Sequence, residues 1–273
     1  SLESNSENDV SPEILNVLHQ YEPIRNKWPV TSVSLPMEED TITSLTRGLP
    51  GSRWQRKKKP QLEWMVQQIG EIINSHEAFG KRAIHILDVG GGQGKLANHL
   101  ANCFGDQIQV HVIDISRGAV KNGAMRAKRM NLSVQYQIND ASKTLFQEQP
   151  MDIVVALHAC GHLSDVALAH AVQHKAGFVI CPCCFLSNPT LRVPGSQETV
   201  EHFLQIPDAD WWAMKYLAEI QGDFFVSHQA IHTLCAVRAD AISRLHTACT
   251  VSLKSFPIQF STRNLCLVGK VNS

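Results

Sequence analysis

The sequence has no long apolar run and no excess of charge of either sign. No stretch approaches the roughly 18 apolar residues that a membrane-spanning helix needs, so no membrane partner is expected. The 25 Lys and Arg residues balance the 25 Asp and Glu residues, which leaves only local basic patches as candidates for binding nucleic acid. The first ten residues, SLESNSENDV, lack the basic and apolar parts of a signal peptide.

The cysteines do not form the pattern of a secreted disulfide scaffold. The chain has eight in 273 residues, and five of them lie between Cys160 and Cys235. Neither an internal repeat nor a low-complexity linker interrupts the sequence. We therefore expect a cytoplasmic or nuclear protein with one large domain and an extension, and the oligomeric state stays open.

The stretch IHILDVGGGQG, residues 84–94, is the feature around which the chain is organised. A short apolar run up to Val89 is typical of a strand that is buried on both faces. Gly90, Gly91, Gly92 and Gly94 follow, and residues 95–100 have helical spacing. A strand, a glycine turn and a helix in succession predict the first half of a nucleotide-binding βαβ unit.

The rest of the chain alternates between strands and helices. This alternation predicts an α/β fold with a mostly parallel sheet, helices on both faces and ligands at the carboxyl ends of the strands. Two final strands with a short connection can pair only as an antiparallel hairpin. The expected strands are 108–114, 134–138, 151–157, 176–180, 250–256 and 264–269, and the expected helices are 60–75, 116–130, 208–221 and 226–245.

The first 59 residues are expected to be an N-terminal helical extension or lid, with the main domain over residues 60–273. A helix is expected from Pro12, with Ser11 as its N-cap. The only concentrated basic run, Arg53 to Lys59, lies at the entry to the next helix beside Trp54. It is either a solvated helix entrance or a clamp for an anionic group.

Asp114 ends the second strand of the βαβ unit, twenty residues after Gly94. At this spacing a carboxylate receives the hydroxyls of a ribose, although an aspartate at the end of a strand can also be an ordinary turn residue. The turn GGGQG does not have the G-x-G-x-x-G spacing of dinucleotide sites. A nucleoside-containing ligand other than a dinucleotide is therefore favoured.

The motif Leu87 to Gly94, the acid Asp114 and the pair Asp140 and Ala141 together resemble the class I S-adenosylmethionine (SAM)-dependent methyltransferases. The resemblance covers about residues 80–270. It implies a Rossmann-like, seven-stranded sheet with an antiparallel C-terminal hairpin, and SAM as the cofactor. The cofactor-binding residues that it implies are Asp88, Gly90, Gly91, Gly92, Gly94, Asp114, Ile115, Asp140, Ala141, Leu157 and His158.

Three further segments resemble a eukaryotic subgroup of that family. The subgroup includes tRNA 2′-O-methyltransferases that act on the acceptor stem, and methyltransferase domains found beside glutathione-transferase-like segments. The matching segments are Lys57–Gln61, Leu157–Asp165 and Cys181–Cys184. In the subgroup the lysine pair is usually followed by His-Glu and the cysteine pair by His, whereas this chain has Gln61-Leu62-Glu63 and Phe185. The additional zinc-binding segments of the tRNA enzymes are absent from this sequence.

Cysteine and histidine side chains follow the fourth and fifth strands of the expected sheet. These strands are neighbours, so His158, Cys160, His162 and the three cysteines of Cys181–Cys184 should gather beside the methyl donor. Three interpretations compete: a soft-metal site, a cysteine nucleophile, and a compact lining of the pocket. The spacings match no standard zinc motif, so we favour the pocket lining and expect no metal.

Methyl transfer from a sulfonium needs alignment and the removal of one proton, which suits a neutral histidine. His158 is the candidate base, and Asp165 is expected to orient a neighbouring histidine. We predict a SAM-dependent transferase that acts on a small molecule. An RNA methyltransferase that binds through the basic run, or a scaffold without activity, are the alternatives. The residues expected to bind the substrate are Lys58, Lys59, Gln61, Cys160, Cys183, Cys184, Trp211 and Trp212.

Overall fold

The computed structural model describes residues 12–33, 54–143, 145–146, 148–205 and 208–272. Its centre is a sheet with the strand order β1-β7-β8-β6-β5-β2-β3-β4. All neighbouring strands are parallel except β8, which runs antiparallel to both β6 and β7. The strands are β1 (Val30–Ser32), β2 (Ile84–Val89), β3 (Ile108–Asp114), β4 (Val134–Ile138), β5 (Ile153–Cys160), β6 (Gly177–Cys183), β7 (Cys249–Ser255) and β8 (Leu265–Val271).

The Rossmann-like sheet and its antiparallel C-terminal hairpin are confirmed, but the sheet has eight strands rather than seven. The additional strand is β1, which pairs in parallel with β7. It belongs to the extension expected over residues 1–59. The extension is also held by the indole of Trp64, whose Nε1 donates to the carbonyl oxygen of Val33 at 3.0 Å.

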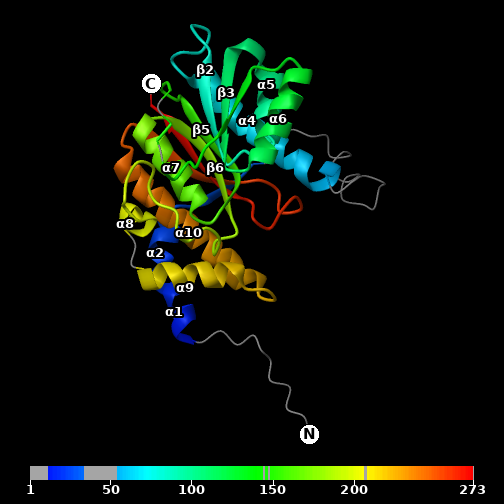
Figure 1. The fold of residues 1–273 in the computed structure, drawn as a ribbon. Helices are drawn as coiled ribbons and strands as arrows, with labels where there is room; N and C mark the ends of the chain where they lie inside the picture. Colours follow the sequence, from blue (N-terminus) through cyan, green and yellow to red (C-terminus); the bar gives the residue numbers. More distant parts are fainter. Residues whose placement is uncertain (1–11, 34–53, 144, 147, 206–207, 273) are drawn as a thin grey trace.

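Helices cover both faces of the sheet, and the two core clusters show why (Figure 1). Successive residues of β2 point to opposite faces. Ile84 and Ile86 pack with α4 and α5, whereas Leu87 and Val89 pack with the cluster that contains α7, α9 and α10. The helices are α1 (Pro12–Gln20), α2 (Glu22–Lys27), α4 (Lys59–Ser75), α5 (Lys95–Phe104), α6 (Arg117–Arg129), α7 (Leu163–His174), α8 (Val200–Leu204), α9 (Asp208–Glu219) and α10 (Phe224–Leu245).

Two short helical segments complete the described chain. The π-helix η1 (Trp54–Lys58) leads directly into α4, and the 3₁₀ turn η2 (Gly105–Gln107) separates α5 from β3. The expected N-cap Ser11 and the first residue of the basic run, Arg53, lie outside the described residues. Within the described part of the chain, no helix has both the length and the apolar character needed to cross a bilayer.

Candidate active site

The glycine turn after β2 forms a cradle of exposed backbone. Gly90, Gly92 and Gly94 adopt φ values of 67°, 58° and 64°, in the left-handed region that favours glycine. A Cβ atom on Gly91 would collide with Oδ2 of Asp88. The backbone of this turn therefore stays accessible at the N-terminal end of α5, and every residue with a side chain would close it or strain it.

Asp88, two residues before Gly90, carries a carboxylate with one unsatisfied oxygen. The residue is 1% exposed, and its Oδ2 atom has no hydrogen-bond partner. Burial, and to a smaller extent the charge of Asp114, raises the pKa of Asp88 to about 7. A buried carboxylate without a partner in the wall of a cavity is suited to meet a cationic group of a ligand.

The carboxylate of Asp114 bridges the glycine turn and the start of α6. Its Oδ2 accepts from the backbone N–H of Gly92 at 2.9 Å, and its Oδ1 accepts from the N–H of Ser116 at 2.7 Å. The side chain is half-buried, whereas that of Ile115 is 72% exposed. Asp114 is thus fixed at the carboxyl end of β3, beside the turn that the sequence places there.

Asp140 and Ala141 occupy the same edge of the sheet, after β4. Oδ1 of Asp140 accepts from the N–H and the hydroxyl of Ser142 at 3.0 and 2.7 Å. Burial raises the pKa of Asp140, but these hydrogen bonds and the ammonium of Lys143, 3.4 Å away, outweigh it and lower the pKa. Ala141 is buried, and its carbonyl oxygen accepts from Nε2 of His170 at 3.0 Å.

A cavity of about 420 Å³ lies over the glycine turn. Of the expected site residues, it brings together Lys58, Asp88, Gly90–Gly92, Leu157 and His158. Gly94, Asp114, Ile115, Asp140 and Ala141 lie outside its lining. Sequence reasoning missed Leu62, Gln93 and Lys95 as lining residues and placed Trp54 only beside the basic run. The ammonium of Lys95 lies 4.6 Å from the centroid of the Trp54 ring.

His158 reaches the cavity because it is the extra residue of a β-bulge. Leu157 pairs with Cys181 and Ala159 with Pro182, so His158 has no partner on β6. Its φ of 60° is unusual for a residue with a side chain. The bulge turns this imidazole toward the cavity, where a regular strand would not place it.

Two side chains from the α4 entry hold the imidazole of His158. Its Nε2 lies 2.6 Å from Oε1 of Gln61 and 3.0 Å from Nζ of Lys58. The amide of Gln61 is oriented by its own hydrogen bond to the carbonyl oxygen of Phe260, at 2.7 Å. Burial, and secondarily the charge of Lys58, lowers the pKa of His158 to about 4, so the ring is neutral near pH 7.

Asp165 has a different role from the one expected. Both of its carboxylate oxygens accept from Arg238, at 2.6 Å from Nε and 3.0 Å from Nη2, and both residues are fully buried. The neighbouring His162 instead lies 3.2 Å from Oε1 of Glu201 and 3.2 Å from Nζ of Lys215. The prediction that Asp165 orients a histidine is therefore wrong, because a buried guanidinium occupies its carboxylate.

The two tryptophans of α9 face opposite environments. Trp211 is 1% exposed and packs over the guanidinium of Arg238 at 4.5 Å, so it belongs to the core. Trp212 is 55% exposed and stacks on Tyr216, with the ring centroids 5.5 Å apart. Of this expected pair, only Trp212 is open to an external ligand.

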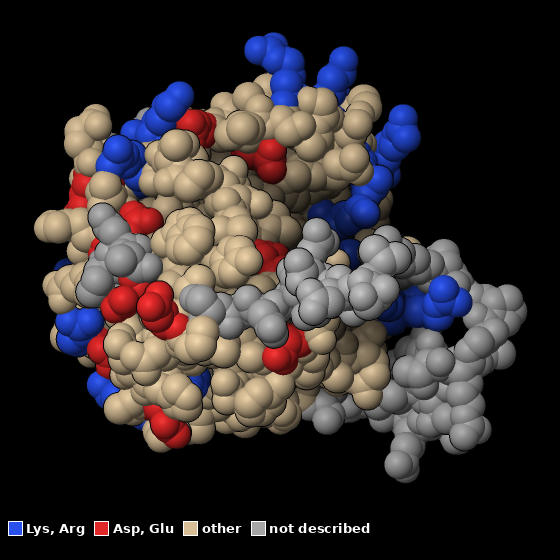
Figure 2. All heavy atoms as spheres, turned by 90° about the horizontal axis from the view of Figure 1, so that it is seen from below, with Lys and Arg blue, Asp and Glu red and all other residues tan. Residues whose placement is uncertain are grey.

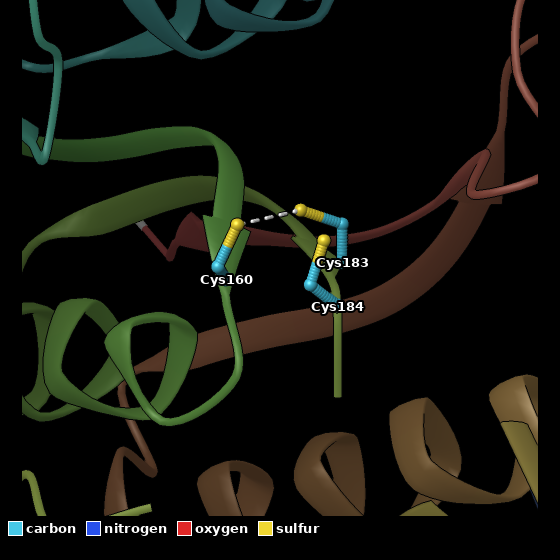
Figure 3. Close-up of side chains that lie close together, drawn as sticks. All are labelled: Cys160, Cys183 and Cys184. Carbon is cyan, nitrogen blue, oxygen red and sulfur yellow. Dashed lines mark hydrogen bonds between the residues drawn. The ribbon is translucent and has the colours of Figure 1, made fainter. Parts of the chain in front are cut away.

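Three of the expected cysteines gather at the carboxyl ends of β5 and β6 (Figure 3). The Sγ atoms of Cys160 and Cys183 are 3.4 Å apart, and all three sulfurs, including that of Cys184, lie within 4.8 Å of one another. Hydrogen bonds with the thiols of Cys183 and Cys184 lower the pKa of Cys160 to about 6. Cys181 and His162 lie elsewhere: Cys181 is buried in the cluster under α4 and α5.

Comparison with known proteins places a methyltransferase domain in this chain. Residues 57–187 match a family model described as "Methyltransferase domain". The human glutathione S-transferase C-terminal domain-containing protein is 30% identical over 130 residues, which make up 47% of this chain but only 19% of that protein. Its homolog from Drosophila melanogaster is 30% identical over 232 residues, 78% of this chain and 37% of the relative. The chain thus spans well under two thirds of either relative.

Among solved structures, a magnesium protoporphyrin IX methyltransferase of Synechocystis PCC 6803 with bound SAM aligns over 97% of this chain and 100% of its own. The TM-score is 0.45 and the identity is 10%.

Proposed function

Because this chain carries a class I methyltransferase domain that uses SAM, we propose that it transfers a methyl group to a small-molecule acceptor that loses a proton. The observation that carries this proposal is the neutral imidazole of His158, turned by its bulge into the cavity over the glycine turn. SAM supplies an activated methyl group on a sulfonium. The protein then has to align the acceptor and manage one proton.

The residues at the glycine turn fit this donor. The unsatisfied, buried carboxylate of Asp88 suits the ammonium group of SAM, and the backbone of Gly90–Gly92 leaves room beside it. Asp114 at the end of β3 suits the ribose hydroxyls, and Asp140 suits the adenine. Ile115, Ala141 and Leu157 are proposed to border the nucleoside.

His158 is proposed to take the proton of the acceptor. Gln61 and Lys58 fix the position of its ring, and the ammonium of Lys58 disfavours an imidazolium 3.0 Å away. The base is therefore already unprotonated when an acceptor binds. We propose that the segment from Trp54 to Lys58, which borders the cavity, covers the site and excludes water during transfer.

The state of the basic run supports a small molecule over RNA. Lys58 is engaged with His158, and Lys59 lies 3.5 Å from the carboxylate of Glu63, so two cations of the run already have partners within the chain. Figure 2 views the molecule from the side of α1 and α9. On this face Lys and Arg lie mostly at the margin, and Asp and Glu are interspersed. RNA binding relies on a continuous basic surface.

One observation favours RNA as a second candidate. The exposed stack of Trp212 on Tyr216 is a platform of the kind on which bases stack. An RNA enzyme would bind its substrate in a strongly salt-dependent manner. That binding would weaken in a Lys57→Ala and Lys59→Ala double variant, which spares the contact of Lys58 with His158.

The first test is the binding of SAM and S-adenosylhomocysteine, measured by calorimetry. Native protein and the control Asp106→Ala, which removes an exposed acid on η2, should bind alike. Asp114→Ala should lose at least tenfold in affinity, about 1.4 kcal/mol, because a charge-assisted hydrogen bond to the ligand disappears. Absence of binding by a folded native chain would leave the scaffold alternative.

The second test identifies the acceptor class. Native protein with SAM labelled in the methyl group is incubated with a metabolite extract and, separately, with total RNA. Label that enters the metabolite fraction and is lost in His158→Ala, while SAM binding is retained, supports the proposal. Label that enters only RNA, and is released by ribonuclease, contradicts it and selects the RNA enzyme.

A further inference from the structure

Cys183 and Cys184 are adjacent in sequence, yet both turn their sulfurs toward Cys160 (Figure 3). In a regular strand, consecutive side chains point to opposite faces of the sheet. Cys184 escapes this rule because its φ is 48°, a left-handed conformation that costs a residue with a side chain on the order of 1 kcal/mol or more. The backbone is thus bent at the one residue where the bend brings a further sulfur to the group.

The β-bulge at His158 contributes the other half of the arrangement. If the pairing continued regularly from Leu157 and Cys181 without a bulge, Ala159 would pair with Cys183. With it, Cys160 becomes the direct partner of Cys183 across β5 and β6. The Sγ atoms of these two cysteines are then only 3.4 Å apart. Two independent departures from regular strand geometry therefore converge on one cluster of three sulfurs.

The backbone around the cluster is held by hydrogen bonds that do not involve the sulfur atoms. The N–H of Gly161 donates to the carbonyl oxygen of Cys183 at 2.8 Å, and the N–H of Ser187 donates to that of Cys184 at 2.9 Å. The side-chain amide of Asn188 donates to the carbonyl oxygen of Cys160 at 2.9 Å. The three cysteines are therefore positioned by the fold itself before any ligand arrives.

We propose that Cys160, Cys183 and Cys184 bind one zinc ion through their three thiolates. With Zn–S bonds of about 2.3 Å and tetrahedral angles, the sulfurs need separations of about 3.8 Å. The observed separations, from 3.4 Å for one pair up to a limit of 4.8 Å for the group, bracket that value.

Among the residues that the structure describes, no fourth His, Cys, Asp or Glu joins this group. Three protein ligands and one open position are characteristic of catalytic zinc sites, whereas structural sites usually have four. Cys160 follows His158 by two residues, so the open position belongs to the same edge of the sheet as the cavity. The proposal does not depend on the proposed function, because binding of the ion is measured directly.

The metal also accounts better for the cluster than the pocket lining that we favoured from the sequence. A lining needs small side chains but not strained backbone. A disulfide between Cys160 and Cys183 would use two of the sulfurs at about 2.05 Å and leave no role for the conformation of Cys184. A ligand that requires three sulfurs uses both the bulge and the left-handed residue.

The test is the zinc content of the full chain, purified with a thiol reductant, reconstituted with zinc and separated from free metal by gel filtration. Native protein should hold about one zinc per chain. Cys184→Ser and Cys160→Ser should each lower the occupancy at least tenfold. The matched control Cys103→Ser, which changes an exposed cysteine on α5, should retain it. Circular dichroism and thermal unfolding verify that the variants are folded.

A second measurement identifies the ligands. Replacement of zinc by Co²⁺ should give sulfur-to-cobalt charge-transfer absorption whose intensity depends on the number of thiolates, together with the weaker visible bands of a tetrahedral ion. Loss of one cysteine should weaken the charge-transfer bands. Absence of stoichiometric metal in the reduced native protein, or unchanged zinc in Cys184→Ser, overturns the proposal. A disulfide that persists under reductant overturns it as well.

Discussion

Replacing Asp88 by asparagine should change how the stability of this protein depends on pH. The carboxyl group of Asp88 is buried without a hydrogen-bond partner for Oδ2, and its pKa rises from 3.8 to about 7 on folding. Between these values the folded chain holds a proton that the unfolded chain releases. The free energy of unfolding of the native protein therefore falls as pH rises through this range.

The size of the effect follows from the pKa shift. Each pH unit between the two pKa values costs about 1.36 kcal/mol, so the native protein should lose about 2 to 3 kcal/mol from this group between pH 5 and pH 7. Asp88→Asn cannot ionise and should not lose that amount. Histidines that titrate in the same range are common to both proteins and cancel in the difference between them.

Urea denaturation at pH 5, 6, 7 and 8, without SAM, measures this difference. The gap in the free energy of unfolding between Asp88→Asn and native protein should widen in favour of the variant as pH rises to about 7 and then level off. Asp106→Asn, which changes an exposed acid, should run parallel to native protein. A constant gap for Asp88→Asn would show that this carboxyl group is already ionised at pH 5 and refute the reasoning.

Two other variants test the packing of the site. Asp165→Asn should lower the free energy of unfolding by about 3–5 kcal/mol, because the guanidinium of Arg238 stays buried without its charge partner; a loss under 1 kcal/mol in urea denaturation would argue against the ion pair. Gly94→Ala should also be destabilised, because its φ is 64° and a Cβ there meets the hydroxyl of Tyr136. The control change Gly80→Ala, with φ 73° and nothing within 4 Å of the added Cβ, should cost only the strain of a positive φ, about 1 kcal/mol. Equal losses in the two glycine variants would contradict the clash.

The central strands and the glycine turn were predictable because their signals are local. The expected strands 108–114 and 134–138 coincide with β3 and β4, and the turn follows from consecutive residues of one segment. The strand β5 was expected to end at residue 157 but continues to Cys160, because a bulge at His158 restores its pairing. Nothing in the apolar pattern marks such a bulge.

The partners of the charged site residues were not predictable in the same way. His158 contacts Gln61, 97 positions away, and Asp165 pairs with Arg238, 73 positions away. Which cation reaches a given carboxylate depends on how α7 and α10 pack, and that information is spread over many apolar contacts. The sequence therefore indicated which side chains are chemically suited to a site, whereas the packing of the helices and strands determines which of them lie together.

The short strand β1 covers part of the edge that β7 would otherwise present at the end of the sheet. Without it, β7 would present a seven-residue edge of unpaired N–H and C=O groups, a template for strands of other molecules. In β1, the residues Val30, Thr31 and Ser32 pair with residues 253–255 of that edge. A chain shortened to begin at Pro60 would therefore risk aggregation through β7 even if its donor site folded correctly. Because β1 is only three residues long, its own outer edge offers few free N–H and C=O groups to a strand of another molecule.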